Sequence, residues 1–305
     1  MDETPQHPLR RKEDQRPRRF RKGMYILPSL FTSANVLLGY YAILQVIHGA
    51  VVYAIAQATQ NPVLEAWHFD AAAKAIGFAV LFDGLDGRIA RMTNTTSDFG
   101  RELDSLADVI TFGIAPALLA WAWGFHQVSA EISRQDMATL LPKLGAIASF
   151  LFLIAGASRL ARFNISTNPQ PSNPGRPGKK YFVGMPIPAG AGVVAAVVHF
   201  SKGDPLVWWG SSLTWLIVVV LAAYLMVSTW RFYSFKDIDL RARQPFRLVV
   251  IFGLLIAGVV LFSGPVLFVI ALTYMLSGIF WRLHWTFRRR RNLPPSGYTQ
   301  ASETS

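Results

Sequence analysis

The sequence has 305 residues, of which 52% are hydrophobic and 16% are charged, and its formal net charge is +12. A soluble domain usually carries about 25% charged residues, so this chain has too few of them to cover a water-facing globule. It contains no cysteine, which excludes disulfides, thiolate metal sites and cysteine nucleophiles. The composition therefore predicts a polytopic membrane protein.

Eight apolar stretches approach the length of about 20 residues that a helix needs to cross a bilayer. They cover residues 30–55, 70–92, 100–124, 140–164, 182–200, 211–230, 246–262 and 265–283. An open sheet would leave unpaired edges in the bilayer, so these stretches are expected to be helices. The sequence predicts an all-α protein with about eight transmembrane helices, in which Gly264 and Pro265 turn the last two into a tight hairpin.

The positions of the basic residues indicate that the positive net charge reflects membrane topology and not nucleic-acid binding. Of the 30 Lys and Arg, 26 fall at alternate ends of the eight stretches, and only Lys74, Arg134, Lys143 and Lys202 fall at the others. Basic residues concentrate on the cytoplasmic side of membrane proteins. We therefore expect both termini in the cytoplasm, with a basic disordered or interfacial tail over residues 1–23 and a disordered tail over 292–305.

Four aspartates lie in or at the ends of the second and third apolar stretches, where a charge costs at least about 2.5 kcal/mol. Asp83 and Asp86 are three residues apart and Asp104 and Asp108 are four apart, so each pair shares a helix face. If the two helices pack antiparallel, the four carboxylates converge. Converged anions repel one another unless a cation neutralises them or they take up protons.

The type of ligand narrows the choice of cation. Only carboxylate oxygens gather here, and the six histidines are scattered without metal-binding spacing. Oxygen ligands favour Mg²⁺, Mn²⁺ or Ca²⁺ over zinc or copper. The small residue Gly87 leaves room for a bulky anion, and Arg91 supplies a planar cation suited to phosphate. The alternative from composition alone is a proton or sodium relay in an ion-coupled transporter, although all the intramembrane carboxylates cluster in one helical pair rather than in two repeats.

The complete spacing resembles the signature of the CDP-alcohol phosphotransferase family. It reads Asp83-x2-Asp86-Gly87-x2-Ala90-Arg91-x8-Gly100-x3-Asp104-x3-Asp108. Further segments resemble the bacterial phosphatidylserine synthase branch of that family. These are Pro28 and Asn35, the run 158–164 (SRLARFN), and the run 184–189 (GMPIPA).

The resemblance implies a six-helix catalytic core that is usually dimeric, opens to the cytoplasm and, in that branch, lies in the bacterial inner membrane. The core would cover residues 24–230, followed by a transmembrane hairpin over 231–291. It further implies a pair of divalent ions, Mg²⁺ or Mn²⁺, held by the aspartates, with the roles assigned as follows. Asp83, Asp86 and Asp104 ligate the pair of ions, and Asp108 completes the ligand shell of the second ion and acts as general base. Gly87, Arg91, Ser97, Asn35 and Thr32 contact CDP-diacylglycerol.

The implied reaction transfers the phosphatidyl group from CDP-diacylglycerol to the hydroxyl of L-serine and releases CMP. The signature itself is shared by enzymes whose acceptor is glycerol phosphate, inositol phosphate, another phospholipid or choline. The acceptor must therefore be inferred from residues outside the signature. Arg159 and Arg162 are candidates for binding the serine carboxylate bidentately. They could equally bind an acceptor phosphate, or anchor the helix end under the positive-inside rule.

The charge distribution makes a topology prediction. Thr95, Arg176 and Lys236 should face the cytoplasm together with both termini, and Asn61 and Lys202 should face the other side. Single cysteines placed at these positions in the cysteine-free chain can be probed with an impermeant thiol reagent on intact cells. Labelling at position 95 would overturn the orientation.

Overall fold

The computed structural model describes residues 26–59, 67–93, 98–128, 135–165, 172, 181–234 and 245–290. Its elements are α2 (Ile26–Thr59), α3 (Trp67–Thr93), α4 (Asp98–Asp108), the π-helix η1 (Val109–Ile114), α5 (Ala115–Gly124), α6 (Gln135–Ile165), β1 (Tyr181–Val183), α7 (Ile187–Phe200), α8 (Trp209–Val227), β2 (Arg231–Tyr233), α9 (Pro245–Leu261) and α10 (Ser263–Arg290). Because α4, η1 and α5 follow one another without a break, the described residues form eight helical rods. The predicted all-α polytopic architecture is confirmed.

Five of these rods are both long and apolar enough to cross a membrane. They cover Leu30–Thr59, Phe99–Gly124, Gln135–Ile165, Trp209–Val227 and Ser263–Phe287. The helices α7 and α9 are shorter, with 14 and 17 residues, and α3 carries several charged residues, the candidate aspartates Asp83 and Asp86 among them.

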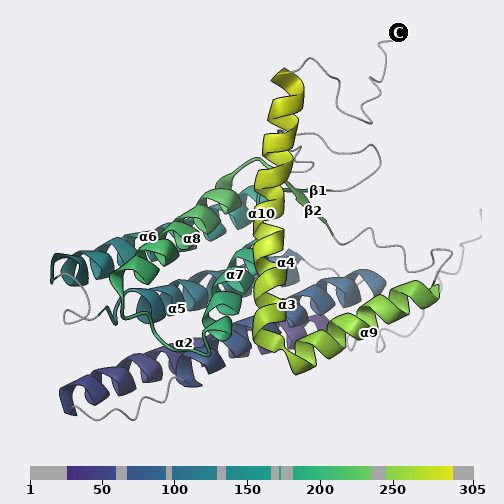
Figure 1. Ribbon diagram of the computed structural model, residues 1–305. Coiled ribbons are helices and arrows are strands. Elements are labelled where there is room, and N and C mark those ends of the chain that lie inside the picture. Colours follow the sequence, from purple (N-terminus) through teal and green to yellow (C-terminus); the bar gives the residue numbers. More distant parts are fainter. Residues whose placement is uncertain are drawn as a thin grey trace, which may run out of the picture.

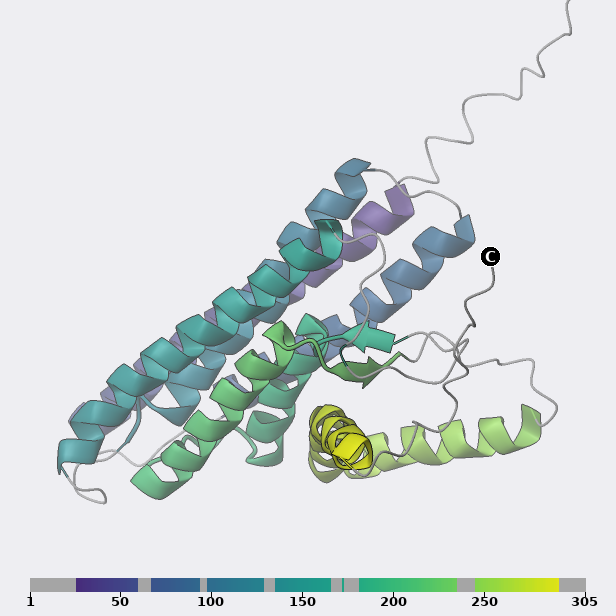
Figure 2. The same cartoon turned by 90° about the horizontal axis from the view of Figure 1, so that it is seen from above.

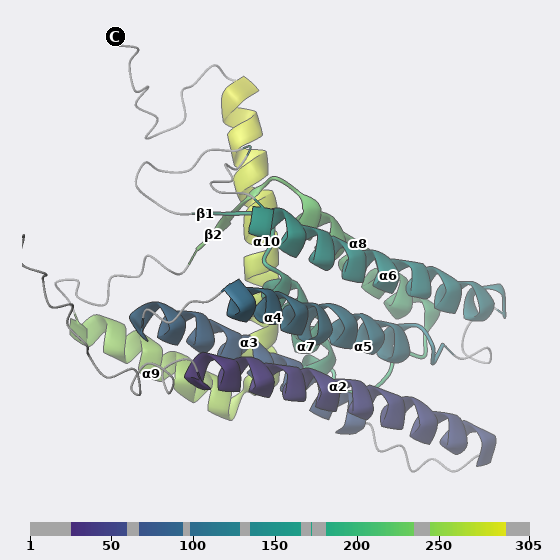
Figure 3. The same ribbon diagram turned by 180° about the vertical axis from the view of Figure 1, so that it is seen from behind.

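The helices pack through small side chains. Helix α2 lies along α3, and α6 lies along α8 (Figures 1 and 3). Alanines fill much of the buried core, and a Cβ on Gly124 would lie 2.1 Å from the Trp215 ring. Small residues let helices in a membrane approach closely, so that van der Waals packing replaces the hydrophobic drive that lipid does not supply.

Side-chain hydrogen bonds tie the bundle together at both ends. At one end Asn164 of α6 donates to the Ser105 hydroxyl of α4 (3.0 Å), and Arg162 donates to the carbonyl of Val227 at the end of α8 (3.0 Å). At the other end the Trp123 indole donates to the Asp204 carbonyl (2.7 Å). The α4–α5 rod therefore starts where α6 ends and ends near the start of α8, so α6 runs antiparallel to that rod.

Helix α10 crosses the bundle steeply. It is seen along its axis in Figure 2, in which α2, α6 and α8 lie lengthwise. Its first residue is held by a part-buried polar network, in which His199 at the end of α7 contacts Asp70 of α3 through Nδ1 (2.5 Å) and the Ser263 hydroxyl through Nε2 (2.9 Å). Lys74 adds an ion pair to Asp70 at 2.7 Å. The network joins α3, α7 and α10.

Two boundaries differ from the sequence-based expectation. The fifth apolar stretch does not start as a helix at residue 182, because residues 181–183 form β1, which pairs antiparallel with β2, and α7 begins only at Ile187. The last two helices do separate at Phe262, but they diverge from that point (Figures 1 and 2) instead of packing side by side as a tight hairpin. Helix α10 packs instead on α7 and β2.

Candidate active site

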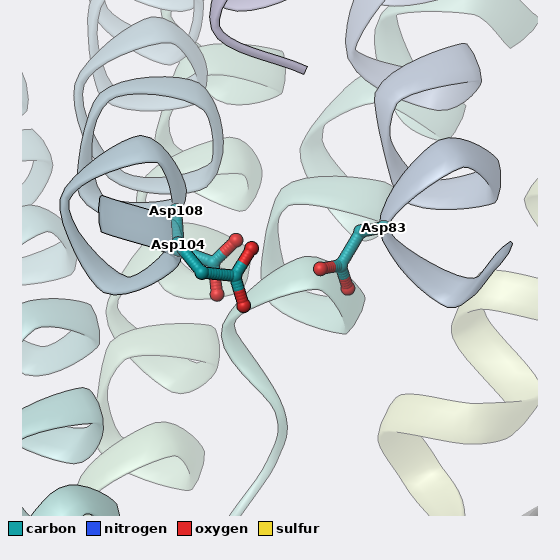
Figure 4. A group of neighbouring side chains, drawn as sticks. All are labelled: Asp83, Asp104 and Asp108. Atoms are coloured by element: carbon teal, nitrogen blue, oxygen red, sulfur yellow. The ribbon is translucent and has the colours of Figure 1, made fainter. Parts of the chain in front are cut away.

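Three of the four predicted aspartates converge. Asp104 and Asp108 project from α4 toward Asp83 of α3 (Figure 4). One carboxylate oxygen from each lies within 4.8 Å of one from the other two. Asp83 and Asp104 are partly exposed, whereas Asp108 is 8% exposed. Two partly open carboxylates and one buried one therefore face a common point between the two helices.

A change of helix type follows this cluster. The α-helical hydrogen bonding of α4 ends at Asp108, and the next six residues, 109–114, form the π-helix η1. A π-helical turn is rare and occurs frequently at functional sites, because it changes the direction in which side chains project. Here it lies between the acidic end of the rod and its apolar half, α5.

Helix α2 closes the site from a third side. The Thr111 hydroxyl of η1 donates to the backbone carbonyl of Asn35 (3.0 Å), and a Cβ on Gly39 would lie 2.5 Å from the same hydroxyl oxygen. This close approach is possible only because residue 39 has no side chain. The Asn35 amide is 2% exposed, and neither of its polar atoms has a hydrogen-bond partner among the described residues. Thr32, one turn earlier on the same helix, is also buried.

The acidic cluster fits a hard divalent cation. Its donors are carboxylate oxygens, which suit Mg²⁺ or Mn²⁺. Three carboxylates at this separation repel one another strongly in a partly buried setting, and a cation between them removes that repulsion. Asp83, Asp104 and Asp108 would hold it.

Part of the predicted donor site falls outside the described side chains. Asp86, Gly87 and Arg91 belong to the last turns of α3, of which the structure describes the backbone course only. Ser97 lies outside the described residues. Their proposed contacts with the CDP group stay predictions.

The two candidate acceptor arginines lie in different environments. Arg159 is 8% exposed, its Nε has no hydrogen-bond partner among the described residues, and it is close enough to Asp108 for an electrostatic interaction. Arg162 donates to the carbonyls of Val227 (3.0 Å) and Ser228 (3.4 Å). It thus satisfies backbone carbonyls that the C-terminus of α8 leaves without an intrahelical partner.

Both arginines border a pocket beside the bundle. Its lining consists of Arg159, Arg162, Phe163, Tyr181, Phe182 and Val183. Strand β1 supplies half of this lining, and no sequence pattern pointed to it, because three residues are too few to show a strand periodicity. The η1 turn and the link between Thr111 and Asn35 were missed for a related reason, since they depend on residues 76 positions apart.

Comparison with known proteins identifies the class to which this arrangement belongs. The model of the family described as CDP-alcohol phosphatidyltransferase matches residues 25–210, so the chain belongs to that family. Among its relatives, a Helicobacter pylori protein named CDP-diacylglycerol–serine O-phosphatidyltransferase is 38% identical over 75% of this chain and 80% of its own length. A Mycobacterium leprae protein of the same name is 33% identical over 67% of this chain and 63% of its own length. A Bacillus subtilis protein of that name is 30% identical over 70% of this chain and 93% of its own length.

The geometry of the cluster predicts how it binds metal. Asp104→Asn should weaken Mn²⁺ binding about tenfold or more, because an amide oxygen carries no charge with which to hold the cation. Titration of the purified protein with Mn²⁺, followed by electron paramagnetic resonance, measures the change. Glu102→Gln is the matched control, since Glu102 is an exposed carboxylate of the same helix and pairs with Arg101. Equal affinities for both variants would contradict the site.

Proposed function

We propose that this protein transfers the phosphatidyl group of CDP-diacylglycerol to L-serine, giving phosphatidylserine and CMP. The observation that carries the proposal is the placement of the buried Arg159 within electrostatic reach of Asp108 in the acidic cluster. A carboxylate-binding group next to a proton acceptor suits an amino-acid acceptor. The names of the relatives point to the same substrate pair.

The reaction forms one bond and breaks one. The serine hydroxyl oxygen attacks the phosphorus that carries the diacylglycerol, the bond from that phosphorus to the bridging diphosphate oxygen breaks, and CMP leaves. The hydroxyl is a poor nucleophile until its proton is removed, so Asp108 accepts the proton as the new bond forms. Asp83, Asp86 and Asp104, together with Asp108, would hold a divalent ion or a pair of them, and such ions, when bound, neutralise the diphosphate and the leaving group.

The two arginines have separate tasks in this proposal. Arg159 binds the serine carboxylate, because its buried guanidinium retains a donor without a partner among the described residues. Arg162 fixes the end of α6 to the end of α8 through its bonds to Val227 and Ser228. In this proposal Asn35 and Thr32 of α2 contact the donor, and Gly87, Arg91 and Ser97 are further contacts predicted from the sequence.

The cellular setting follows from the charge distribution and the family. We propose a homodimer in the bacterial inner membrane, with both termini and the acidic cluster on the cytoplasmic side. The catalytic core comprises residues 24–230, and the segment 231–291 is an addition to it.

The function is tested by supplying the purified protein with CDP-diacylglycerol, Mn²⁺ and labelled acceptors one at a time. Serine should yield labelled phosphatidylserine, and Asp108→Asn should abolish turnover while binding of CDP-diacylglycerol remains measurable, since the amide keeps the size but cannot take the proton. If glycerol phosphate, inositol phosphate or choline gave product and serine did not, serine would be excluded as the acceptor. Near-normal turnover of Asp108→Asn at saturating metal would exclude the general-base role.

The division of labour between the arginines gives a kinetic prediction. Arg159→Ala should raise the KM for serine by one to two orders of magnitude, on the scale of about 1.5–3 kcal/mol for a charged hydrogen bond, and leave the KM for CDP-diacylglycerol almost unchanged. Lysine should rescue poorly because a point charge cannot form a bidentate fork. Arg162→Ala should instead lower the melting temperature. Steady-state kinetics with each substrate varied in turn decides, and an unchanged serine KM in Arg159→Ala would remove this residue from the acceptor site.

A further inference from the structure

Helix α10 lies beyond the part of the chain that the family model matches, which ends at residue 210, yet it packs against the sheet whose other strand lines the acceptor pocket. The connection runs through the two-stranded sheet. Strand β1 lines the pocket, β2 pairs with β1 through Phe182 and Phe232, and β2 packs on α10. The sheet is therefore a layer between the pocket and this helix.

One face of α10 is shaped to receive that layer. Tyr274, Gly278 and Trp281 recur at intervals of four and three residues, which places them on one side of a helix. Phe232 is fully buried, with its ring centroid 5.7 Å from that of Tyr274. A Cβ on Gly278 would lie 2.2 Å from the Phe232 ring, so the close approach requires glycine.

The neighbouring residue of β2 is held from both sides. The Arg231 guanidinium carbon lies 4.9 Å from the ring centroid of Tyr181 in β1 and 4.9 Å from that of Trp281 in α10. Such cation–π contacts are directional and attractive. They connect the strand that lines the pocket to α10 independently of the Phe232 packing.

Tyr274 extends this contact to the acceptor arginine. Its hydroxyl donates to the backbone carbonyl of Tyr233 (3.2 Å), so the hydroxyl oxygen keeps its lone pairs as acceptors. The Arg159 guanidinium is buried, and both Tyr274 and Asp108 lie within electrostatic range of it. The hydroxyl is thus tied to strand β2, the partner of the strand that lines the pocket beside Arg159.

We propose that α10 completes the acceptor pocket and that Tyr274 is a positioning residue: its ring on Phe232 and its hydroxyl on the Tyr233 carbonyl hold β2, and with β2 the β1 wall of the pocket in which Arg159 receives the carboxylate of an amino-acid acceptor. This inference rests on the proposed function, because it assigns a supporting group to the same acceptor site. It gives the C-terminal segment a role in the choice of acceptor. The donor site, formed by α2, α3 and α4, does not depend on it.

The test separates the two substrates. In the full-length protein, Tyr274→Phe keeps the ring on Phe232 and removes only the hydroxyl, so it should raise the KM for serine by about three- to tenfold. The kcat and the KM for CDP-diacylglycerol should stay near the values of the unmodified protein. The matched control is Tyr224→Phe, because Tyr224 is an exposed tyrosine of α8. An unchanged serine KM, or an equal rise in both KM values, would overturn the inference.

A second pair of variants tests the docking of α10 without touching a polar group. Gly278→Ala should push the helix off Phe232 and also raise the serine KM, whereas Gly253→Ala in α9, where a Cβ meets nothing within 4 Å, should not. A serine KM that is unchanged in Gly278→Ala would show that the pocket does not depend on α10.

The unmodified protein separates this inference from the proposed function. If it transfers to a different acceptor, the serine assignment fails, and the Tyr274→Phe comparison is then made with that acceptor. The positioning role stands if the KM for that acceptor rises and falls if it does not.

Discussion

Mutual repulsion of three carboxylates is the constraint on which the rest of the site depends. Two unit charges about 5 Å apart at an effective dielectric constant of about 20 repel by roughly 3 kcal/mol. The three pairs formed by Asp83, Asp104 and Asp108, whose oxygens lie within 4.8 Å of one another, would together cost about as much as a whole domain gains on folding. The cluster is consistent with a stable bundle only if positive charge is brought to it.

The surrounding helices are organised to hold these charges without allowing them to separate. The link from Thr111 to the Asn35 carbonyl and the bare surface of Gly39 fix α2 against η1, one turn beyond Asp108. Arg159 approaches from α6 and offsets part of the negative charge around Asp108. Tight packing of small residues along the rods makes the arrangement rigid, because closely packed interiors transmit displacements instead of absorbing them.

The features that the sequence predicted are those that depend on short-range periodicity. Spacings of three and four residues placed Asp104 and Asp108 on one helix face, and apolar stretches located eight helical rods. Features that arise from distant partners could not be predicted. Arg162 donates hydrogen bonds to the carbonyls of residues 65 and 66 positions further along the chain. The sequence near Arg162 therefore contains nothing that distinguishes its role from that of Arg159. The β1–β2 pair joins two segments of three residues each, and Tyr274 reaches β2 through a hydrogen bond to a residue 41 positions earlier in the chain.

The position of α10 also bears on how one signature can serve several acceptors. The acidic signature lies on α3 and α4, and in the proposed function it acts on the diphosphate of the donor, the part of the reaction that does not depend on the acceptor. The pocket beside Arg159 is bordered by β1, and β1 is backed by β2 and α10, which lie beyond the segment that the family model matches. Helix α10 is anchored at its start by the bond between His199 and Ser263, and the face that meets β2 carries no member of the acidic cluster. If the proposed roles are correct, the acceptor side of the site can therefore change along this face while the acidic side stays the same.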